Sequence, residues 1–225
     1  WGTASSSVAC PVDQLQVAEA VTVEMMLRGC DQFDAQSVAT IAYSAALACL
    51  SEASTVWAKI AATSIPRLAD FSDRQLANLL WAYAKIATTD GEAFVDAIDV
   101  DLQKRLPPLA PIDLSLITWS VAKLARGSEA FYREAAASSL STGHNWSNSD
   151  ARNIVTLLYA FVASEHAAEH DAVIQRLSTM SLSRLPEMAM QGLTNAVWAW
   201  ATACYTQRAW FDGVASELRN RRDAE

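Results

Sequence analysis

The chain has 225 residues, with 17 Lys and Arg against 25 Asp and Glu, which gives a formal net charge of −8. Hydrophobic residues make up 52% of the sequence and charged residues 19%, a balance that excludes intrinsic disorder. Only 7 Gly and 6 Pro argue against turn-rich all-β folds and against phosphate loops built from glycine. The acidic balance also argues against an ordinary nucleic-acid-binding domain, since such domains are usually basic.

No apolar stretch approaches the length of about 18 residues that a membrane-spanning helix needs, so we expect no membrane insertion. The four cysteines, Cys10, Cys30, Cys49 and Cys204, are far apart and form no C-x-x-C pair. We expect reduced thiols, with Cys49 and Cys204 acting as small core residues at the ends of apolar helices.

From about residue 33 onward, one aromatic position returns at an almost constant spacing. Its successive members are 38, 38, 40 and 39 residues apart, and they are Tyr43, Trp81, Trp119, Tyr159 and Trp198. An aliphatic residue lies five positions before each of them, and the five are Val38, Leu76, Leu114, Ile154 and Leu193. A small residue, Ser or Ala, directly follows each aromatic. Such a period is the sequence signature of a helical-repeat protein.

Each copy is predicted to form two helices. The first helix begins at an N-cap candidate in four copies, and these candidates are Asp34, Ser72, Asp113 and Asp150. A polar break, such as residues 88–91, separates it from a second helix, which ends in Arg-Leu-Pro at 105–107 and 184–186. Residues 11–29 have the pattern of the second helix of a truncated, preceding repeat.

Helix pairs of this size cannot bury their apolar faces alone, so they must stack on their neighbours. We therefore predict an all-α fold, an α-solenoid of about five helix-pair repeats of 38–40 residues plus an N-terminal partial repeat. We expect a single elongated domain over residues 1–225 without an internal linker. The partial repeat covers 11–32, and the repeats lie near 33–70, 71–108, 109–148, 149–187 and 188–225.

The repeated pattern is similar to that of the octotricopeptide-repeat family and its relatives, the heptatricopeptide repeats and the helical arrays of RAP-domain and FAST-kinase-like proteins. The carrying sequence is Phe71-Ser72-x-x-x-Leu76-Ala77-Asn78-x-Leu80-Trp81-Ala82-x-Ala84-Lys85, and partial copies surround Trp119 and Trp198. The resemblance spans about residues 33–225. It implies RNA binding in mitochondria or chloroplasts, in transcript processing, stability, translation or ribosome assembly. Neither the proline-rich Trp motif of algal octotricopeptide repeats nor a RAP domain is recognisable, so the resemblance implies no enzymatic activity.

Four positions of each first helix, at offsets −7, −3, 0 and +4 from the aromatic, share one helix face. We call these positions the stripe; they contain amide, hydroxyl, aromatic and cationic side chains and no Asp or Glu. This chemistry suits single-stranded RNA, because rings stack on bases, amides read base edges and cations meet phosphates. The candidate RNA-binding residues are Arg74, Asn78, Trp81, Lys85, Trp119, Lys123, Arg152, Tyr159, Asn195 and Trp198. The alternative is structural: the aromatics fill the groove between repeats, and the polar residues form a solvated face.

Three arginines, Arg67, Arg105 and Arg184, lie in register at the ends of second helices, with His144 or Asn145 in the equivalent place of the third copy. We expect these cations to cap their own helix ends, where they complement the helix dipole. A ladder in register would also be able to track phosphates.

Catalytic and metal-binding patterns are scarce. His166 and His170 are four residues apart, a spacing that zinc sites use, but no third ligand is evident, so a solvated helix start is the simpler interpretation. No Ser/His/Asp order, glycine-rich phosphate loop or paired carboxylate motif occurs. We therefore predict a protein that is not an enzyme and that needs no cofactor or metal.

Two functions remain open. The first is a non-catalytic module that holds single-stranded RNA or rRNA along its first helices, in the mitochondrion or chloroplast that the resemblance implies. The alternative is a structural scaffold for protein partners in a large organellar assembly, such as a ribosome or membrane complex. The net charge does not decide, because the first-helix segments 36–50, 74–89, 114–128, 151–164 and 188–211 hold six Lys and Arg and no acid. One surface is therefore expected to be mildly basic.

Overall fold

The computed structural model describes residues 29–49, 54–87, 89–141, 146, 149–205 and 207–223, together with the single positions 20 and 24. In this part of the chain every regular element is helical and no strand is formed, which confirms the all-α prediction. None of the described helices is long and apolar enough to cross a membrane. The partial repeat predicted for 11–32 lies almost entirely outside the described residues.

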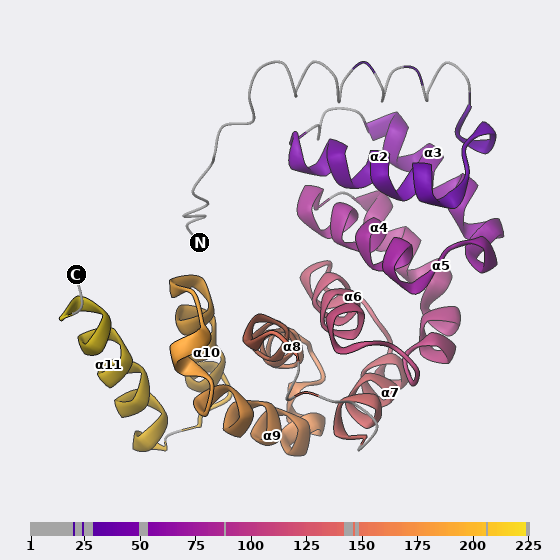
Figure 1. Cartoon of the computed structure of the whole chain (residues 1–225). Coiled ribbons are helices and arrows are strands. Elements are labelled where there is room, and N and C mark those ends of the chain that lie inside the picture. Colours follow the sequence, from indigo (N-terminus) through magenta and orange to yellow (C-terminus); the bar gives the residue numbers. More distant parts are fainter. Residues whose placement is uncertain are drawn as a thin grey trace. The chain divides into compact units, whose positions relative to one another are not determined.

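Long helices alternate along the chain as first and second members of a pair (Figure 1). The first helices are α2 (Ala35–Leu47), α4 (Asp73–Ile86), α6 (Pro111–Lys123), α8 (Ala151–Ala163) and α10 (Met190–Thr202). The second helices are α3 (Ser54–Ser64), α5 (Thr89–Arg105), α7 (Glu129–Leu140), α9 (Asp171–Leu182) and α11 (Arg208–Arg222). Short 3-10 turns occupy connections: η1 (Cys30–Gln32), η2 (Ile65–Asp70), η4 (Ala167–His170) and η5 (Leu185–Glu187).

The chain divides into two compact units, residues 1–94 and 95–225, and the division falls inside α5. Within the first unit, α2 packs side by side with α4. Within the second unit, α8 packs against α6 on one side and α10 on the other, and α9 packs behind α8. The expected single, uninterrupted domain stays a prediction.

The starts of the first helices follow from their local sequences. Asp34, Ser72 and Asp150 are N-caps whose side chains accept a backbone N–H of the first turn, as predicted. The prediction for Asp113 is wrong, because α6 already begins at Pro111, whose fixed φ suits the first helical position. Asp113 therefore lies within the first turn of α6, where it is buried.

The repeated aliphatic residue is the fourth residue of each first helix, and it is buried in all five: Val38, Leu76, Leu114, Ile154 and Leu193. In three pairs the residue before the N-cap is a buried hydrophobic residue, and these residues are Phe71, Leu109 and Met188. This spacing is that of a hydrophobic staple, which sets the angle at which the chain enters a helix. In these three pairs the staple accounts for an aliphatic residue at the fourth helical position.

Four of the first helices lead into a residue with positive φ that is not glycine. These residues are Cys49, Ala87, Ala125 and Cys204, with φ between 52° and 57°. Each lies six positions after the repeated aromatic, so the left-handed turn is itself part of the repeat. Cys49 and Cys204 are consequently exposed in these turns, and the prediction that they are core residues is wrong.

The core of each unit contains the residue two positions after the repeated aromatic, which is buried in all five first helices: Ala45, Tyr83, Val121, Phe161 and Trp200. In the first unit, the ring of Tyr83 lies 5.4 Å from that of Trp57 and 5.0 Å from that of Phe94. The Tyr83 hydroxyl donates a 2.8 Å hydrogen bond to the backbone oxygen of Trp57, so its burial leaves no unpaired polar group. In α4 this inner position therefore joins the first helix to the second helices α3 and α5.

Candidate nucleic-acid interface

The stripe lies on an accessible side of every first helix. None of its positions is buried, and the outermost ones, at offsets −7 and +4, are exposed in all five helices. The first unit brings Arg74, Asn78, Trp81 and Lys85 together on one face of α4. The second unit carries the other candidates on three adjacent helices: Trp119 and Lys123 on α6, Arg152 and Tyr159 on α8, and Asn195 and Trp198 on α10.

The repeated aromatics pair with each other across adjacent first helices. In the first unit, the ring centroids of Tyr43 and Trp81 are 4.7 Å apart with an interplanar angle of 34°. In the second unit, those of Tyr159 and Trp198 are 4.6 Å apart with an angle of 33°. Two separate units therefore build the same tilted pair, which places a hydrophobic contact between neighbouring helices at the edge of the accessible face.

The ring pairs limit how a base can bind. Rings at these separations are already in contact with each other, and a base inserted between them would need the rings to part to roughly 7 Å, twice a contact distance of about 3.5 Å. A base is therefore restricted to the outer faces and edges of each pair. Trp198 offers the most accessible ring in the described part of the stripe, with 41% of its surface exposed.

Three cations of the stripe are exposed and available. Lys85, Lys123 and Arg152 form no ion pair with any acid in the described part of the chain. Lys85 and Lys123 lie in the last turns of α4 and α6, where the negative end of the helix dipole favours a cation. An anionic ligand would therefore meet these side chains without first breaking a salt bridge.

The two candidate amide side chains of the stripe, Asn195 and Asn78, differ in their surroundings. The Oδ1 atom of Asn195 accepts a 2.9 Å hydrogen bond from Nε2 of Gln191, one turn earlier in the stripe of α10. Asn78 occupies the equivalent position of α4 and is half-buried. This contact uses the Asn195 oxygen and leaves its Nδ2 donors for an acceptor on a base edge.

The first helices carry less net positive charge than the segments counted in the sequence. As the structure bounds them, the first helices carry four cations, Arg74, Lys85, Lys123 and Arg152, and two acids, Asp73 and Asp113. Both acids directly precede the segments that the sequence shows to be free of acid, so that count of the segments is unchanged. The stripe itself still has no acid, because Asp113 is buried and Asp73 lies outside the stripe positions.

Two further cations of those sequence segments, Arg126 and Arg208, lie outside the first helices. Arg126 follows α6, and its Nε lies 3.6 Å from Oδ2 of Asp96. Arg208 begins α11, and its Nε lies 3.2 Å from Oδ2 of Asp212. Because each already has an acidic partner, neither adds to the positive charge of the stripe.

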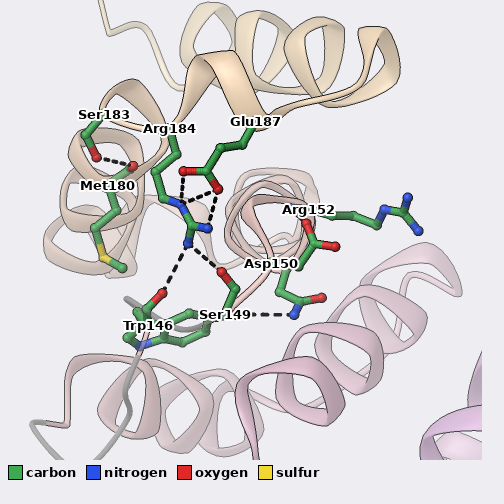
Figure 2. A network of polar contacts seen from close by, with 9 residues as sticks. Trp146, Ser149, Asp150, Arg152, Met180, Ser183, Arg184 and Glu187 are labelled. Atoms are coloured by element: carbon green, nitrogen blue, oxygen red, sulfur yellow. Dashed lines mark hydrogen bonds and ion pairs between the residues drawn. The ribbon is translucent and has the colours of Figure 1, made fainter.

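The arginines at the ends of second helices have a different role from the one predicted. Figure 2 shows the guanidinium of Arg184 between Glu187 and the backbone oxygens of Trp146 and Ser149. Its Nη1 donates to the Trp146 oxygen at 3.2 Å, and its Nε is 3.0 Å from both carboxylate oxygens of Glu187. This side-chain hydrogen bond lowers the pKa of Glu187. Arg152, by contrast, points away from this network (Figure 2).

The same contact recurs at two other pairs. Nη1 of Arg67 donates to the Phe33 oxygen at 3.1 Å, and Nη2 of Arg221 donates to the Leu185 oxygen at 3.2 Å. These oxygens lie in or beside the connection that leads into the first helix of the same pair, so each arginine closes its own helix pair. The prediction that Arg67 and Arg184 cap their own helices is therefore wrong. His144 and Asn145, proposed for the third copy, lie outside the described residues.

The sequence marks Arg221 only as part of a basic helix end and not as a member of this series, because it is not followed by the Leu-Pro that marks Arg105 and Arg184. A second signal was present in two cases, because an acid follows three residues after Arg67 and Arg184. Arg221 instead pairs with Glu217, four residues earlier, at 2.7 Å. An arginine with an acid one turn away, at the end of a second helix, is the pattern that all three share.

The two histidines of the candidate zinc pair have different environments. His166 is half-buried, with its Nδ1 3.9 Å from Oε2 of Glu169. His170 is buried beside Phe161 and Tyr132, with ring centroids 5.4 and 6.4 Å away, so the prediction of a solvated helix start is wrong for it. Burial lowers the pKa of His170. The described residues contain no group of three side chains able to hold a metal ion.

No known family pattern matches the chain, and no characterised protein matches its sequence. The resemblance to octotricopeptide-type arrays therefore rests on the residues of the chain alone.

Proposed function

We propose that the chain is a non-catalytic module that binds single-stranded RNA along the stripe of its first helices. The observation that carries the proposal is the composition of the stripe: its positions hold no acidic residue, and three exposed cations, Lys85 in the first unit and Lys123 and Arg152 in the second, have no acidic partner in the described part of the chain. Aromatic and amide side chains lie among those cations. This combination matches what single-stranded RNA requires.

In this proposal the three kinds of side chain have separate tasks. Lys85, Lys123 and Arg152 meet phosphates, and Asn78 and Asn195 contact base edges. The ring pairs offer only their outer faces and edges, so they orient bases without enclosing them. With a net charge of −8 on the whole chain, we expect weak binding that depends strongly on salt.

The wider setting follows from the resemblance. We propose that the helix pairs continue from one unit to the next as an α-solenoid, in which roughly one base is met per repeat. The RNA would be a transcript or rRNA in mitochondria or chloroplasts, and the chain would act in transcript processing, stability, translation or ribosome assembly. No catalytic step is assigned to the chain.

The test compares two triple variants that remove the same positive charge. One carries Lys85→Gln, Lys123→Gln and Arg152→Gln on the stripe, and the control carries Lys59→Gln, Lys104→Gln and Arg133→Gln on second helices. Binding of a labelled, mixed-sequence 10-nucleotide RNA is measured by fluorescence anisotropy between 50 and 200 mM salt. Each lost phosphate contact makes the slope of log affinity against log salt shallower by about 0.7.

We expect the stripe variant to bind more weakly, with a slope shallower by about 2, and the control to bind like the unaltered chain. Absence of binding at 50 mM salt, or an equal loss in both variants, would contradict the proposal. Equal loss would mean that net charge alone, and not the stripe, governs the interaction.

A second candidate is a scaffold that binds protein partners through the same face. The observation that favours it is the exposure of apolar side chains on the stripe, 52% for Leu47 and 42% for Ile112. Purification with and without nuclease separates the two functions. A partner protein that stays bound after nuclease treatment supports the scaffold, and a partner that is lost supports RNA.

A further inference from the structure

The second unit contains a small pocket between the ends of two adjacent first helices, α6 and α8. It holds about 290 Å³ of empty space including its open mouth, close to the lower end of the range for small-ligand pockets. Its wall is formed by the turn after α6, the connection after α8 and one ring of α7, with Ala125, Arg126, Tyr132, Ala163, Glu165 and His166 among the lining residues. Because Ala163 is also the last stripe position of α8, the pocket adjoins the stripe.

The connection after α8 differs from those that follow the other first helices. The residue six positions after the repeated aromatic is left-handed in the other four pairs, and these residues are Cys49, Ala87, Ala125 and Cys204. In the fourth pair this residue is Glu165, which is not left-handed. Ser164 ends α8 in an extended conformation, and η4 follows. The fourth pair therefore has a carboxylate, followed by His166, where the others have a methyl group or a thiol.

Two rings line the pocket. The His166 ring is half-buried, and its centroid lies 5.3 Å from that of Tyr132. The Tyr132 hydroxyl donates a 3.0 Å hydrogen bond to the backbone oxygen of Arg126, so this donor is already used. Burial raises the pKa of Tyr132, and the charges of Asp99 and Glu165 raise it further, in keeping with a Glu165 carboxylate close to the pocket.

The carboxylate of Glu165 is the charged acceptor that the pocket offers to a ligand. It is exposed and forms no hydrogen bond or ion pair within the described part of the chain. Arg126 already pairs with Asp96, and Nδ1 of His166 lies 3.9 Å from Oε2 of Glu169. The pocket therefore suits a flat group that can stack on a ring and donate two parallel N–H bonds to a carboxylate.

Guanine is the RNA base with this arrangement of donors. Its N1–H and N2–H lie side by side on the Watson–Crick edge, whereas adenine and cytosine offer one amino group beside an acceptor nitrogen. Uracil offers one N–H between two carbonyl oxygens, which a carboxylate repels. We propose that the pocket binds a guanine base of the RNA held along the stripe, with its N1–H and N2–H donating to Glu165 and its ring stacked on His166. This inference rests on the proposed function.

An arginine side chain of a partner protein carries a similar pair of parallel donors. It is a cation, however, and Arg126 lines the pocket while Lys123 is exposed two residues before Ala125. These positive charges repel a second cation and attract the phosphate of a nucleotide. The charge around the pocket therefore favours a guanine nucleotide over an arginine.

Binding to two labelled 10-nucleotide RNAs tests the proposal, one of uridines alone and one with a single central guanosine. Fluorescence anisotropy at 50 mM salt compares the unaltered chain, Glu165→Gln and the control Glu129→Gln, which removes the same charge from an exposed position of α7. Both glutamates are exposed, so we expect the three proteins to unfold at the same temperature.

We expect the unaltered chain and Glu129→Gln to bind the guanosine RNA about tenfold more tightly than the uridine RNA. Glu165→Gln should lose this preference, because an amide offers one acceptor oxygen instead of two, and should still bind the uridine RNA. Equal affinity of the unaltered chain for both RNAs, or a preference that survives in Glu165→Gln, would overturn this inference and leave the proposed function in place. Absence of binding to either RNA would overturn both.

Nuclear magnetic resonance of the His166 ring separates the two classes of ligand without depending on the stripe. The chain has three histidines, so a His166→Asn variant assigns the ring signals. Millimolar guanosine monophosphate should shift these signals, and uridine monophosphate or N-acetyl-arginine amide at the same concentration should not. Equal shifts with both nucleotides, or a shift with the arginine compound alone, would overturn the proposal.

Discussion

Two tryptophans of α10, Trp198 and Trp200, belong to different regions of the molecule although they are two residues apart. Trp198 is 41% exposed on the accessible face and touches Tyr159 of the preceding first helix. Trp200 is fully buried on the inner face, with its ring 5.5 Å from Trp210 and 6.1 Å from Phe211 of the second helix. Successive helix positions are about 100° apart, so a shift of two residues turns a side chain to nearly the opposite side.

The same contrast holds in α4, where Trp81 lies on the accessible face and Tyr83 on the inner face. A repeated aromatic is therefore not by itself a sign of ligand binding or of the core. Its offset within the helix decides between the two. We expect substitutions on the inner face to change the stability of the fold and those on the accessible face to change binding.

The largest expected effect tests this division directly. Trp200→Ala should lower the free energy of unfolding by about 3–5 kcal/mol, because it leaves a cavity beside Trp210. Trp198→Ala should lower it by only about 1 kcal/mol, the contribution of one ring pair at a partly exposed site. Chemical denaturation followed by circular dichroism measures both. Equal losses would mean that the accessible aromatics are as structural as the inner ones.

Substitutions of Arg184 test whether this side chain stabilises the connection that leads into α8. Arg184→Ala should lower the free energy of unfolding by about 1–3 kcal/mol, because the oxygens of Trp146 and Ser149 lose a charged donor. Arg133→Ala, which removes an exposed ion pair with Glu129, should change it by less than about 1 kcal/mol. Denaturant titration compares them.

Arg184→Lys provides the control for charge. An ammonium group lacks the planar fork that contacts Glu187 and two backbone oxygens together, so we expect it to restore less than half of the loss. Full recovery in Arg184→Lys would contradict the assigned geometry. If Arg184→Ala leaves the free energy of unfolding unchanged, the arginine does not stabilise the fold and its guanidinium is available to bind a phosphate.

A substitution in the turns that end the first helices is expected to have a smaller effect. It should raise the free energy of unfolding, whereas the changes at Trp200 and Arg184 lower it. Ala125 has a φ of 52°, a conformation in which the Cβ atom is strained and glycine is not. Ala125→Gly should therefore raise the free energy of unfolding by about 0.5–1 kcal/mol, after the greater flexibility of the unfolded chain is subtracted. Thermal unfolding measures the gain.

Ala137→Gly is the matched control, because Ala137 is an exposed residue inside α7. Glycine inside a helix should lower the free energy of unfolding by about 1 kcal/mol. The opposite signs of the two alanine-to-glycine changes are the signature of the left-handed turn. A loss of stability in Ala125→Gly would show that the turn is not strained.

The smallest effect at neutral pH is expected at His170, on the inner face beside Phe161. Burial is the main cause that lowers its pKa below the ordinary value of 6.5, and His166 lowers the pKa further. Glu169 and Glu129 act in the opposite direction and raise it. As the pH falls below about 6.5, the unfolded chain takes up a proton that the folded chain does not, so stability decreases. At pH 7 and above this contribution is complete.

The free energy of unfolding measured from pH 8 to pH 5 checks this expectation. The decline below about pH 6.5 should be smaller in His170→Phe, whose ring occupies a similar site without a titratable group. An unchanged decline in this variant would assign the pH dependence to other groups.

The sequence alone left open whether the aromatics of the stripe are accessible or fill the groove between repeats, but it predicted the helical elements and three of the four N-caps. These depend on interactions within about one helical turn, on the spacing of apolar residues and on caps such as Asp34 and Ser72. Asp113 was misassigned because two local start signals competed, and Pro111 prevailed over the aspartate. The left-handed turns were not predicted, because alanine and cysteine rarely adopt them and no glycine marked the positions.

The amino-acid sequence by itself determined that the chain forms helix pairs at a constant period and which residues lie on one face of each first helix. Only the tertiary structure decided that the repeated aromatics close into pairs, that Arg184 reaches an oxygen 38 residues earlier, and that His170 is buried beside Phe161. The physical reason is separation along the chain. Helix periodicity and capping act within one turn, whereas the partners of these side chains come from other helices and connections, and packing alone brings them together.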